Sequence, residues 1–304
     1  METLVRESDK NSKQTAGNLL PQEYLEPVIH PSFFEWCPLS SQYRIVTIGK
    51  NHTFLALFAG AALYLYYDPR METVRFLYND GEVFAVYKPP GLHTVQLPKG
   101  GGESLADRLI TIHPLLAEVS KNRGDAGLIN RLDEDTSGIV VGAWSRDTWN
   151  KLFEALLEGK IHKTYQALVE GHPTSPQTIH TFLGSPHRGA QKIKVYEKEP
   201  PPWARALPGT TDFTTLRQLP TLDCSLIAVS ASPARRHQVR AHSAYRGHPL
   251  VGDALYGSTR ALPVSTKERR AFFLHADTVS FAHPSTGEPI SITAPARDEL
   301  ELPE

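Results

Sequence analysis

The stretch NRLDEDTSGIVV, residues 130–141, passes from a charged loop into an apolar run that predicts a buried strand. A loop in this place can hold a carboxylate at the rim of a cleft, because the strand behind it fixes the backbone. Thr136 and Ser137 can bond neighbouring backbone groups, and Gly138 permits close packing of another segment. Asp133 is therefore a candidate catalytic carboxylate, although an aspartate in a loop is more often a turn former.

The segments around this stretch predict a sheet with few crossover helices. Strand-like runs cover residues 73–78, 82–88, 139–144, 163–170, 221–230, 271–281 and 289–293, and the first two are joined by the turn Asn79-Asp80-Gly81. Helices are expected over residues 104–119, with Ser104 as cap, and over 147–157 and 235–246. Residues 172–210, rich in Pro, Gly, His and Lys, predict a long surface excursion. The pattern indicates an α+β fold: a mostly antiparallel mixed sheet with flanking helices and loops.

We expect three parts along the chain: a flexible lead over residues 1–22, a small accessory region of unknown role over 23–70, and a catalytic domain over 71–304. The most apolar run, residues 53–67, has 15 residues. A membrane span needs about 20 apolar residues, so we interpret the run as buried secondary structure of a soluble protein. Two cysteines in no metal spacing and no secretory signal favour a reducing compartment, the cytoplasm, and we expect a monomer.

The formal net charge is −1, but the charged residues are distributed unevenly along the chain. Residues 1–40 hold six acids and three bases, and residues 287–304 hold five acids and one base. The middle of the chain therefore has 28 bases and 22 acids, a net charge of +6. A basic middle can present a positive face to a nucleic acid, although many other enzymes show such unevenness.

Two further segments carry candidate site residues. Tyr165, in KTYQA at residues 163–167, stands on a predicted strand, where a tyrosine is most often simply half-buried. In PARRHQVRAH, residues 233–242, a helix would place Arg236 and Arg240 on one face, and Gln238 and His242 likewise. Such a density of arginines suits recognition of phosphate or carboxylate, but a solvated basic helix is an equal alternative.

A metal site is not expected from this sequence. His237, His242 and His248 lie close together in the chain, but no carboxylate or cysteine joins them at ligand spacing. The following block GHPLVGDALYG, residues 247–257, has the glycines and proline of a sharply turning strand and loop, and by itself it predicts only structure.

Four blocks together resemble the RluA-type pseudouridine synthases: VFAVYKPPGLHT (83–94), NRLDEDTSGIVV (130–141), KTYQALVEG (163–171) and ARRHQVRAHSAYRGHPLVGDALYG (234–257). They occur in that family's order and span most of residues 71–304. The resemblance implies an isomerase that cleaves the glycosidic bond of a uridine in RNA, rotates the uracil and rejoins it through carbon. It implies no cofactor and an RNA partner, ribosomal or transfer RNA.

The resemblance also implies roles for individual residues. Asp133 matches the essential aspartate, Tyr165 the active-site tyrosine, and Arg240 the basic residue paired with that aspartate. Arg131 matches an arginine that enters the RNA stack as the target nucleotide leaves. We expect further RNA contacts from the basic residues Lys163, Arg235, Arg236 and His237.

Two other functions remain open from the residues alone. The first is an RNA-binding protein on the same fold without catalysis, although binding would not need a carboxylate among phosphates. The second is a glycosidase, which ordinarily needs two carboxylates across the bond, with Glu134 or Asp135 as the second. Asn130, where many relatives have His, and Pro233-Ala234, where many have Thr-Gly, depart from the family pattern and bear on the choice of RNA target.

Overall fold

The computed structural model describes residues 4–6, 43–48, 52–59, 62–67, 74–97, 102–174, 176–231, 234–263 and 270–296. The chain divides into two compact units, residues 1–74 and 75–304. In the first unit four antiparallel strands form a sheet in the order β1-β4-β3-β2: β1 (Leu4–Arg6), β2 (Tyr43–Ile48), β3 (His52–Ala59) and β4 (Ala62–Tyr67). The apolar run 53–67 is thus two strands, and none of the described helices is long and apolar enough to cross a membrane.

The lead predicted over residues 1–22 falls mostly outside the described residues. Its one described part, Leu4–Arg6, is a strand that pairs with Tyr64–Tyr66 of β4. The first unit covers residues that showed no recognisable motif, and the expected boundary at residue 71 lies close to the division between the units.

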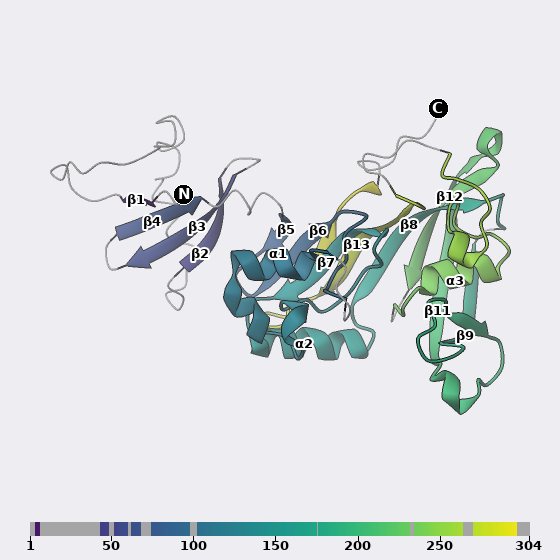
Figure 1. Cartoon of the computed structure of the whole chain (residues 1–304), viewed down its shortest axis with the longest axis horizontal. Helices are drawn as coiled ribbons and strands as arrows, with labels where there is room; N and C mark the ends of the chain where they lie inside the picture. The colour runs from purple at the N-terminus through teal and green to yellow at the C-terminus, as the bar shows by residue number, and fades with distance from the viewer. Residues whose placement is uncertain are drawn as a thin grey trace. The chain divides into compact units, whose positions relative to one another are not determined.

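The second unit is built on one ten-stranded sheet in the order β10-β9-β11-β12-β8-β13-β7-β6-β5, with β14 paired to β13 (Figure 1). Its strands are β5 (Arg75–Asn79), β6 (Val83–Lys88), β7 (Ser137–Ala143), β8 (His162–Glu170), β9 (Gln177–Gly184), β10 (Lys194–Tyr196), β11 (Leu207–Leu219), β12 (Cys224–Ala231), β13 (Leu274–Ala282) and β14 (Pro289–Thr293). Among these described strands only β7 and β13 pair in parallel, so the predicted α+β fold with a mostly antiparallel mixed sheet is confirmed.

The parallel contact between β7 and β13 depends on Gly138. This residue has φ +113° and lies opposite Ala276 in the register. A Cβ at this position would overlap the Ala276 carbonyl oxygen, so no larger residue fits without moving the backbone. Gly138 therefore lets the strand that follows the Asp133 loop pack directly beside β13.

The hairpin of β5 and β6 is confirmed, since the two strands pair antiparallel across Asp80 and Gly81. The helix expected over residues 104–119 is wrong in its length. Helix α1 (Leu105–Ile112) has the predicted Ser104 cap, which forms a reciprocal capping box with Asp107. Pro114 cannot continue an α-helix, and a 3₁₀ turn, Pro114–Glu118, follows instead.

The surface excursion expected over residues 172–210 is also wrong. Strands β9 and β10 and the start of β11 lie within it, and β9 pairs with both other strands. Along β9 exposed and buried positions largely alternate, because one face of the strand packs against α3 (Gln238–Tyr245) while the other meets solvent. The Gly, Pro and His residues of this segment concealed that alternation.

The helices divide the second unit into two halves. Helix α2 (Arg146–Leu157) packs on β7, whereas α3 packs on β10, β11 and β12 (Figure 1). The central strand β8 runs between the halves, and the loop that carries Asp133 enters from the β7 side. The arrangement brings that loop towards α3.

Candidate active site

The loop that carries Asp133 is clamped on both sides of the carboxylate. Thr94 Oγ1 accepts a hydrogen bond from the Leu132 amide at 3.0 Å and donates to the Leu132 carbonyl at 2.8 Å. On the other side, Lys88 Nζ donates to the Glu134 carbonyl at 2.9 Å. The VFAVYKPPGLHT block therefore fixes the backbone that aims Asp133, although it lies about 40 residues earlier in the sequence.

Lys88 is fully buried and its ammonium faces three carbonyl oxygens. Besides Glu134, these belong to Pro89 and Leu92, each at 2.7 Å. Burial lowers the pKa of Lys88 to about 7, against the attraction of the acids in the Asp133 loop. The role of Lys88 is structural: it ties the turn after β6 to the loop before β7.

Asp133 forms a short ion pair with Arg240, whose Nη1 lies 2.9 Å from Oδ2. The rest of the guanidinium is held by Asp253, with Nε 2.7 Å from Oδ2 and Nη2 2.9 Å from Oδ1. The rings of Tyr256 and Phe272 lie 5.1 and 4.6 Å from the guanidinium carbon. Burial alone would lower the pKa of Arg240, but Asp253 and then Asp133 outweigh it and raise this pKa, so the arginine stays charged.

Helix α3 begins at Gln238, three residues later than the sequence pattern predicts, because His237 adopts a left-handed conformation with φ 53°. The expected shared face of Arg236 and Arg240 is therefore wrong. Arg236 lies outside the helix and donates to the carbonyls of Ala190 and Gln191.

The other predicted pair on α3 is confirmed. Gln238 Nε2 donates to Thr211 Oγ1 at 2.8 Å, and His242 Nδ1 lies 2.7 Å from the same oxygen. His242 Nε2 also lies 2.9 Å from Thr181 Oγ1, and burial lowers the pKa of His242 to about 4. These two side chains therefore dock α3 onto β9 and β11.

His237 stands beside the carboxylate of Asp133. Its Nε2 lies 3.6 Å from Asp133 Oδ1, and its Nδ1 lies 3.0 Å from the Tyr256 hydroxyl. Burial lowers the pKa of His237 to about 4, and the charges of Arg240 and Arg236 add to this effect against that of Asp133. His237 is therefore neutral near pH 7, and its contact with Asp133 is not an ion pair.

Tyr165 lies on β8, between Val229 of β12 and Ala276 of β13, and is buried. Burial raises the pKa of its hydroxyl, and the negative charge of Asp133 raises this pKa further. Tyr165 is therefore a neutral phenol near the Asp133–Arg240 pair.

The remaining predicted residues lie around this set without joining it. Lys163 is buried two residues before Tyr165 on the same strand, its ammonium has no ionic partner within the described ranges, and burial lowers its pKa to about 8. Arg131 is exposed on the Asp133 loop. Arg235 has a buried Nε without a hydrogen-bond partner among the described residues.

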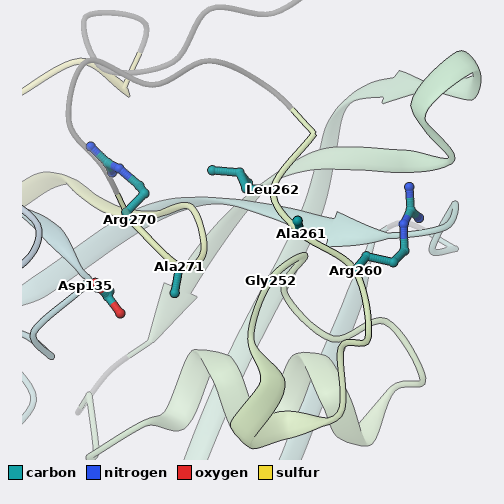
Figure 2. A pocket seen from close by; sticks show the side chains of 7 residues that line it. All are labelled: Asp135, Gly252, Arg260, Ala261, Leu262, Arg270 and Ala271. Atoms are coloured by element: carbon teal, nitrogen blue, oxygen red, sulfur yellow. The ribbon is translucent and has the colours of Figure 1, made fainter.

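The second unit also contains a pocket of about 570 Å³, whose lining includes none of the residues that surround Asp133 (Figure 2). It is lined by Asp135, Gly252, Arg260, Ala261, Leu262, Arg270 and Ala271, of which only Asp135 was considered from the sequence, as a second carboxylate of a glycosidase. Asp135 lines this pocket, and burial, then the charge of Glu134, raises its pKa. No three His, Cys, Asp or Glu side chains in the described ranges are grouped to hold a metal ion.

Sequence reasoning missed Asp253 and Tyr256, which hold Arg240 and His237. Both stand in GHPLVGDALYG, the block that appeared to be only structural. The available signal was Asp253 itself, a lone acid close to the arginines of the preceding block.

Comparison with known proteins defines the class of this site. A family model described as RNA pseudouridylate synthase matches residues 82–245, more than half of the chain. The ribosomal large subunit pseudouridine synthase D of Xanthomonas campestris is 32% identical over 246 residues, covering 77% of this chain and 69% of the relative. A Chlorobaculum parvum protein named an uncharacterized RNA pseudouridine synthase is 30% identical over 283 residues, covering 87% of this chain and 82% of the relative. The chain belongs to the RNA pseudouridylate synthase family and is an RNA pseudouridine synthase.

The four sequence blocks and these relatives assign it to the RluA type, as the sequence predicted. The fold is shared with a solved structure of the human RNA pseudouridylate synthase domain containing 1. That likeness has a TM-score of 0.54 at 22% identity and covers 73% of this chain and 83% of the human one. The RNA partner and the isomerase class follow from the family.

Proposed function

We propose that this enzyme converts uridines of ribosomal RNA to pseudouridine, with Asp133 as its nucleophile or base. The name of the Xanthomonas relative, and of several others, supports large-subunit ribosomal RNA as the first candidate substrate, and transfer RNA stays the second. The observation that carries the role of Asp133 is its 2.9 Å contact with Arg240, a cation that is itself fixed by Asp253.

The reaction asks for a carboxylate that stays ionised until it acts. The bond from C1′ to N1 breaks, a bond from C1′ to C5 forms, the C5 proton leaves and N1 ends with a proton, so no atom is gained or lost. The adjacent arginine holds Asp133 through a charge-assisted hydrogen bond and fixes its direction. Tyr165 offers a flat wall to the uracil and a neutral hydroxyl that can take part in proton transfer.

A uridine within folded RNA must leave its stack before Asp133 can reach it, which costs a few kcal/mol. We propose that Arg131, exposed two residues before Asp133, fills the vacated space and stacks on the neighbouring bases. We propose a phosphate contact for Arg235, which is half-buried and has no ionic partner in the described part of the chain. Lys163 is buried, so its position gives no support to the predicted contact with RNA. For Arg236 and His237 the support is weaker, since their side chains already bond within the protein.

The test is to map pseudouridines in ribosomal and transfer RNA incubated with the wild-type enzyme and with Asp133→Asn. The Asn variant keeps the size of the side chain but cannot act as nucleophile or base. We expect it to form no pseudouridine while it binds the same RNA with similar affinity. Asp147→Asn, which alters an exposed acid paired with Lys151, serves as the matched control and should retain full activity.

Turnover by Asp133→Asn would refute the role of this aspartate. Binding of RNA by the wild-type protein without any conversion would favour the alternative, a non-catalytic RNA-binding protein on the same fold. The monomeric state, the cytoplasmic location and the domain boundaries at residues 22 and 70 remain predictions.

A further inference from the structure

The two oxygens of Asp133 have different neighbours. Oδ2 accepts a charged hydrogen bond from Arg240 at 2.9 Å, the distance of a strong contact. Oδ1 faces His237, whose Nε2 lies 3.6 Å away. What His237 presents to Oδ1 depends on which ring nitrogen carries the proton.

The hydrogen bonds of Tyr256 settle the tautomer of His237. The Ile193 amide donates to the Tyr256 hydroxyl oxygen at 2.9 Å, so that oxygen already acts as an acceptor. If Nδ1 of His237 carried the proton, the Tyr256 oxygen would accept a second hydrogen bond, from that Nδ1–H. The hydroxyl proton of Tyr256, which is buried, would then have no acceptor among the described residues. If instead Nδ1 is unprotonated, the hydroxyl donates to it and every group is satisfied.

The proton of a neutral His237 then resides on Nε2, the nitrogen that faces Asp133. A doubly protonated ring is disfavoured because Arg240 already supplies one cation to this carboxylate and Arg236 adds a second positive charge nearby. The burial of the ring acts in the same direction. A neutral N–H donor thus stands opposite Oδ1, at a distance that a small movement on substrate binding would close.

We propose that Tyr256 and His237 are positioning residues, with the Tyr256 hydroxyl setting the His237 tautomer so that Nε2–H orients Oδ1 of Asp133 towards the uridine. Asp253 and Tyr256 belong to one short segment, the second at the end of the 3₁₀ turn Ala254–Tyr256. This one segment therefore holds both neighbours of the Asp133 carboxylate: Asp253 binds Arg240, and Tyr256 binds His237. The backbone of His237 is left-handed, with φ 53°, and its ring lies beside the carboxylate.

This inference rests on the proposed catalytic role of Asp133, but its first test does not. Nitrogen-15 labelling of histidines, with NMR at pH 7, reports the tautomer of each ring, and His237→Gln identifies the His237 signals by their loss. We expect the Nε2–H tautomer in the wild-type protein and a mixture of tautomers in Tyr256→Phe, which lacks only the hydroxyl. A protonated ring or an Nδ1–H tautomer in the wild-type protein would overturn the proposal, as would an unchanged His237 in Tyr256→Phe.

The second test measures turnover with His237→Ala and His237→Gln. Both variants share the left-handed backbone strain, but only glutamine carries an amide N–H that reaches the place of Nε2. We expect kcat to fall between about tenfold and a hundredfold in His237→Ala with KM for RNA little changed, because orientation and not binding is lost. His237→Gln should recover a large part of kcat. Equal kcat values for the two variants would overturn the proposal.

Tyr256→Phe should lower kcat in the same way, and thermal unfolding followed by circular dichroism checks that the variant is folded. The matched control is Tyr245→Phe, which removes the hydroxyl of an exposed tyrosine on α3 that donates to Glu197, and it should leave kcat unchanged. Turnover by Asp133→Asn would overturn the proposed function but would leave the NMR result standing, so the two failures are distinguishable.

Discussion

Arg240 lies between two carboxylates, and its two contacts differ in kind. Asp253 is almost fully buried and takes two of the guanidinium hydrogen bonds, while Asp133 is a quarter exposed and takes one. A buried charge without its partner is costly, so the Asp253 pair fixes where Arg240 points. Asp133 receives a cation that has little freedom to move, and its other oxygen, Oδ1, faces His237.

Replacing Asp253 by Asn should therefore destabilise the protein strongly. The change removes the charge that compensates a buried guanidinium, and we expect a loss of about 3 kcal/mol in the free energy of unfolding by urea. The control is Asp223→Asn, because Asp223 is exposed and lies 3.5 Å from Arg260. Exposed pairs contribute about 1 kcal/mol or less. Equal losses of unfolding free energy in the two variants would contradict the claim that Asp253 compensates the buried charge of Arg240.

Lys163 should make stability depend on pH in the alkaline range. Its pKa is about 8 in the folded protein because of burial, against 10.5 in the unfolded chain. Between these values the unfolded chain binds more protons, so stability rises as pH increases from 8 to 10.5. Relative to Lys163→Met, the wild-type protein should gain up to about 3 kcal/mol over this window. Urea unfolding of both proteins at about pH 7.5, 9 and 10.5 measures the difference, and parallel pH profiles would refute it.

At the scale of elements, the site depends on loops that are held by backbone contacts. The Asp133 loop is hydrogen-bonded to the segment after β6, and the segment after α3 packs closely against the residues that precede β13. Gly252 provides the second contact: its φ is 91°, and a Cβ there would overlap the Ala271 carbonyl oxygen. The residue after it, Asp253, depends on this close approach.

Gly252→Ala should therefore lower the free energy of unfolding by more than backbone strain alone would. Gly189 has a similar φ of 80°, but a Cβ added to it would meet no described atom within 4 Å, so Gly189→Ala carries the strain without the clash. We expect Gly252→Ala to lose about 2 kcal/mol more in free energy of unfolding than Gly189→Ala, and to lose kcat as well. Similar unfolding curves and rates for the two alanine variants would show that Asp253 does not need the close contact.

At the scale of the whole molecule, the chain consists of two units, and every residue of the candidate site belongs to the second. The ten-stranded sheet brings together residues from distant parts of the sequence: Arg240 and Asp133 are 107 positions apart. Asp133 lies just before β7, and Tyr165 lies on β8. Strand β13 pairs with both β7 and β8, and α3 follows β12, which is the other neighbour of β8.

A shortened protein that begins at residue 71 should fold and keep its isomerase activity. All groups proposed to contact the uridine, and the sheet that holds them, lie in residues 75–304. We expect kcat on a fixed RNA within about threefold of the full chain and one cooperative unfolding transition. The rate of uridine conversion measures kcat, and thermal unfolding shows whether there is one cooperative transition. Loss of kcat in a folded short protein would show that the first unit takes part in catalysis.

Local patterns in the sequence predicted the hairpin of β5 and β6, the strand β7 and the helix α2, because turn residues and hydrophobic periodicity act within about ten residues. The roles of Asp133, Tyr165 and Arg240 came instead from the resemblance that the four blocks carry. The resemblance already implied that Arg240 pairs with Asp133. It took the folded structure to show that Asp253 holds this arginine and that His237 adopts a left-handed backbone beside the carboxylate. Such contacts depend on sheet register and on the packing of α3 across β11, and no pattern within one segment encodes which distant side chain will satisfy a buried charge.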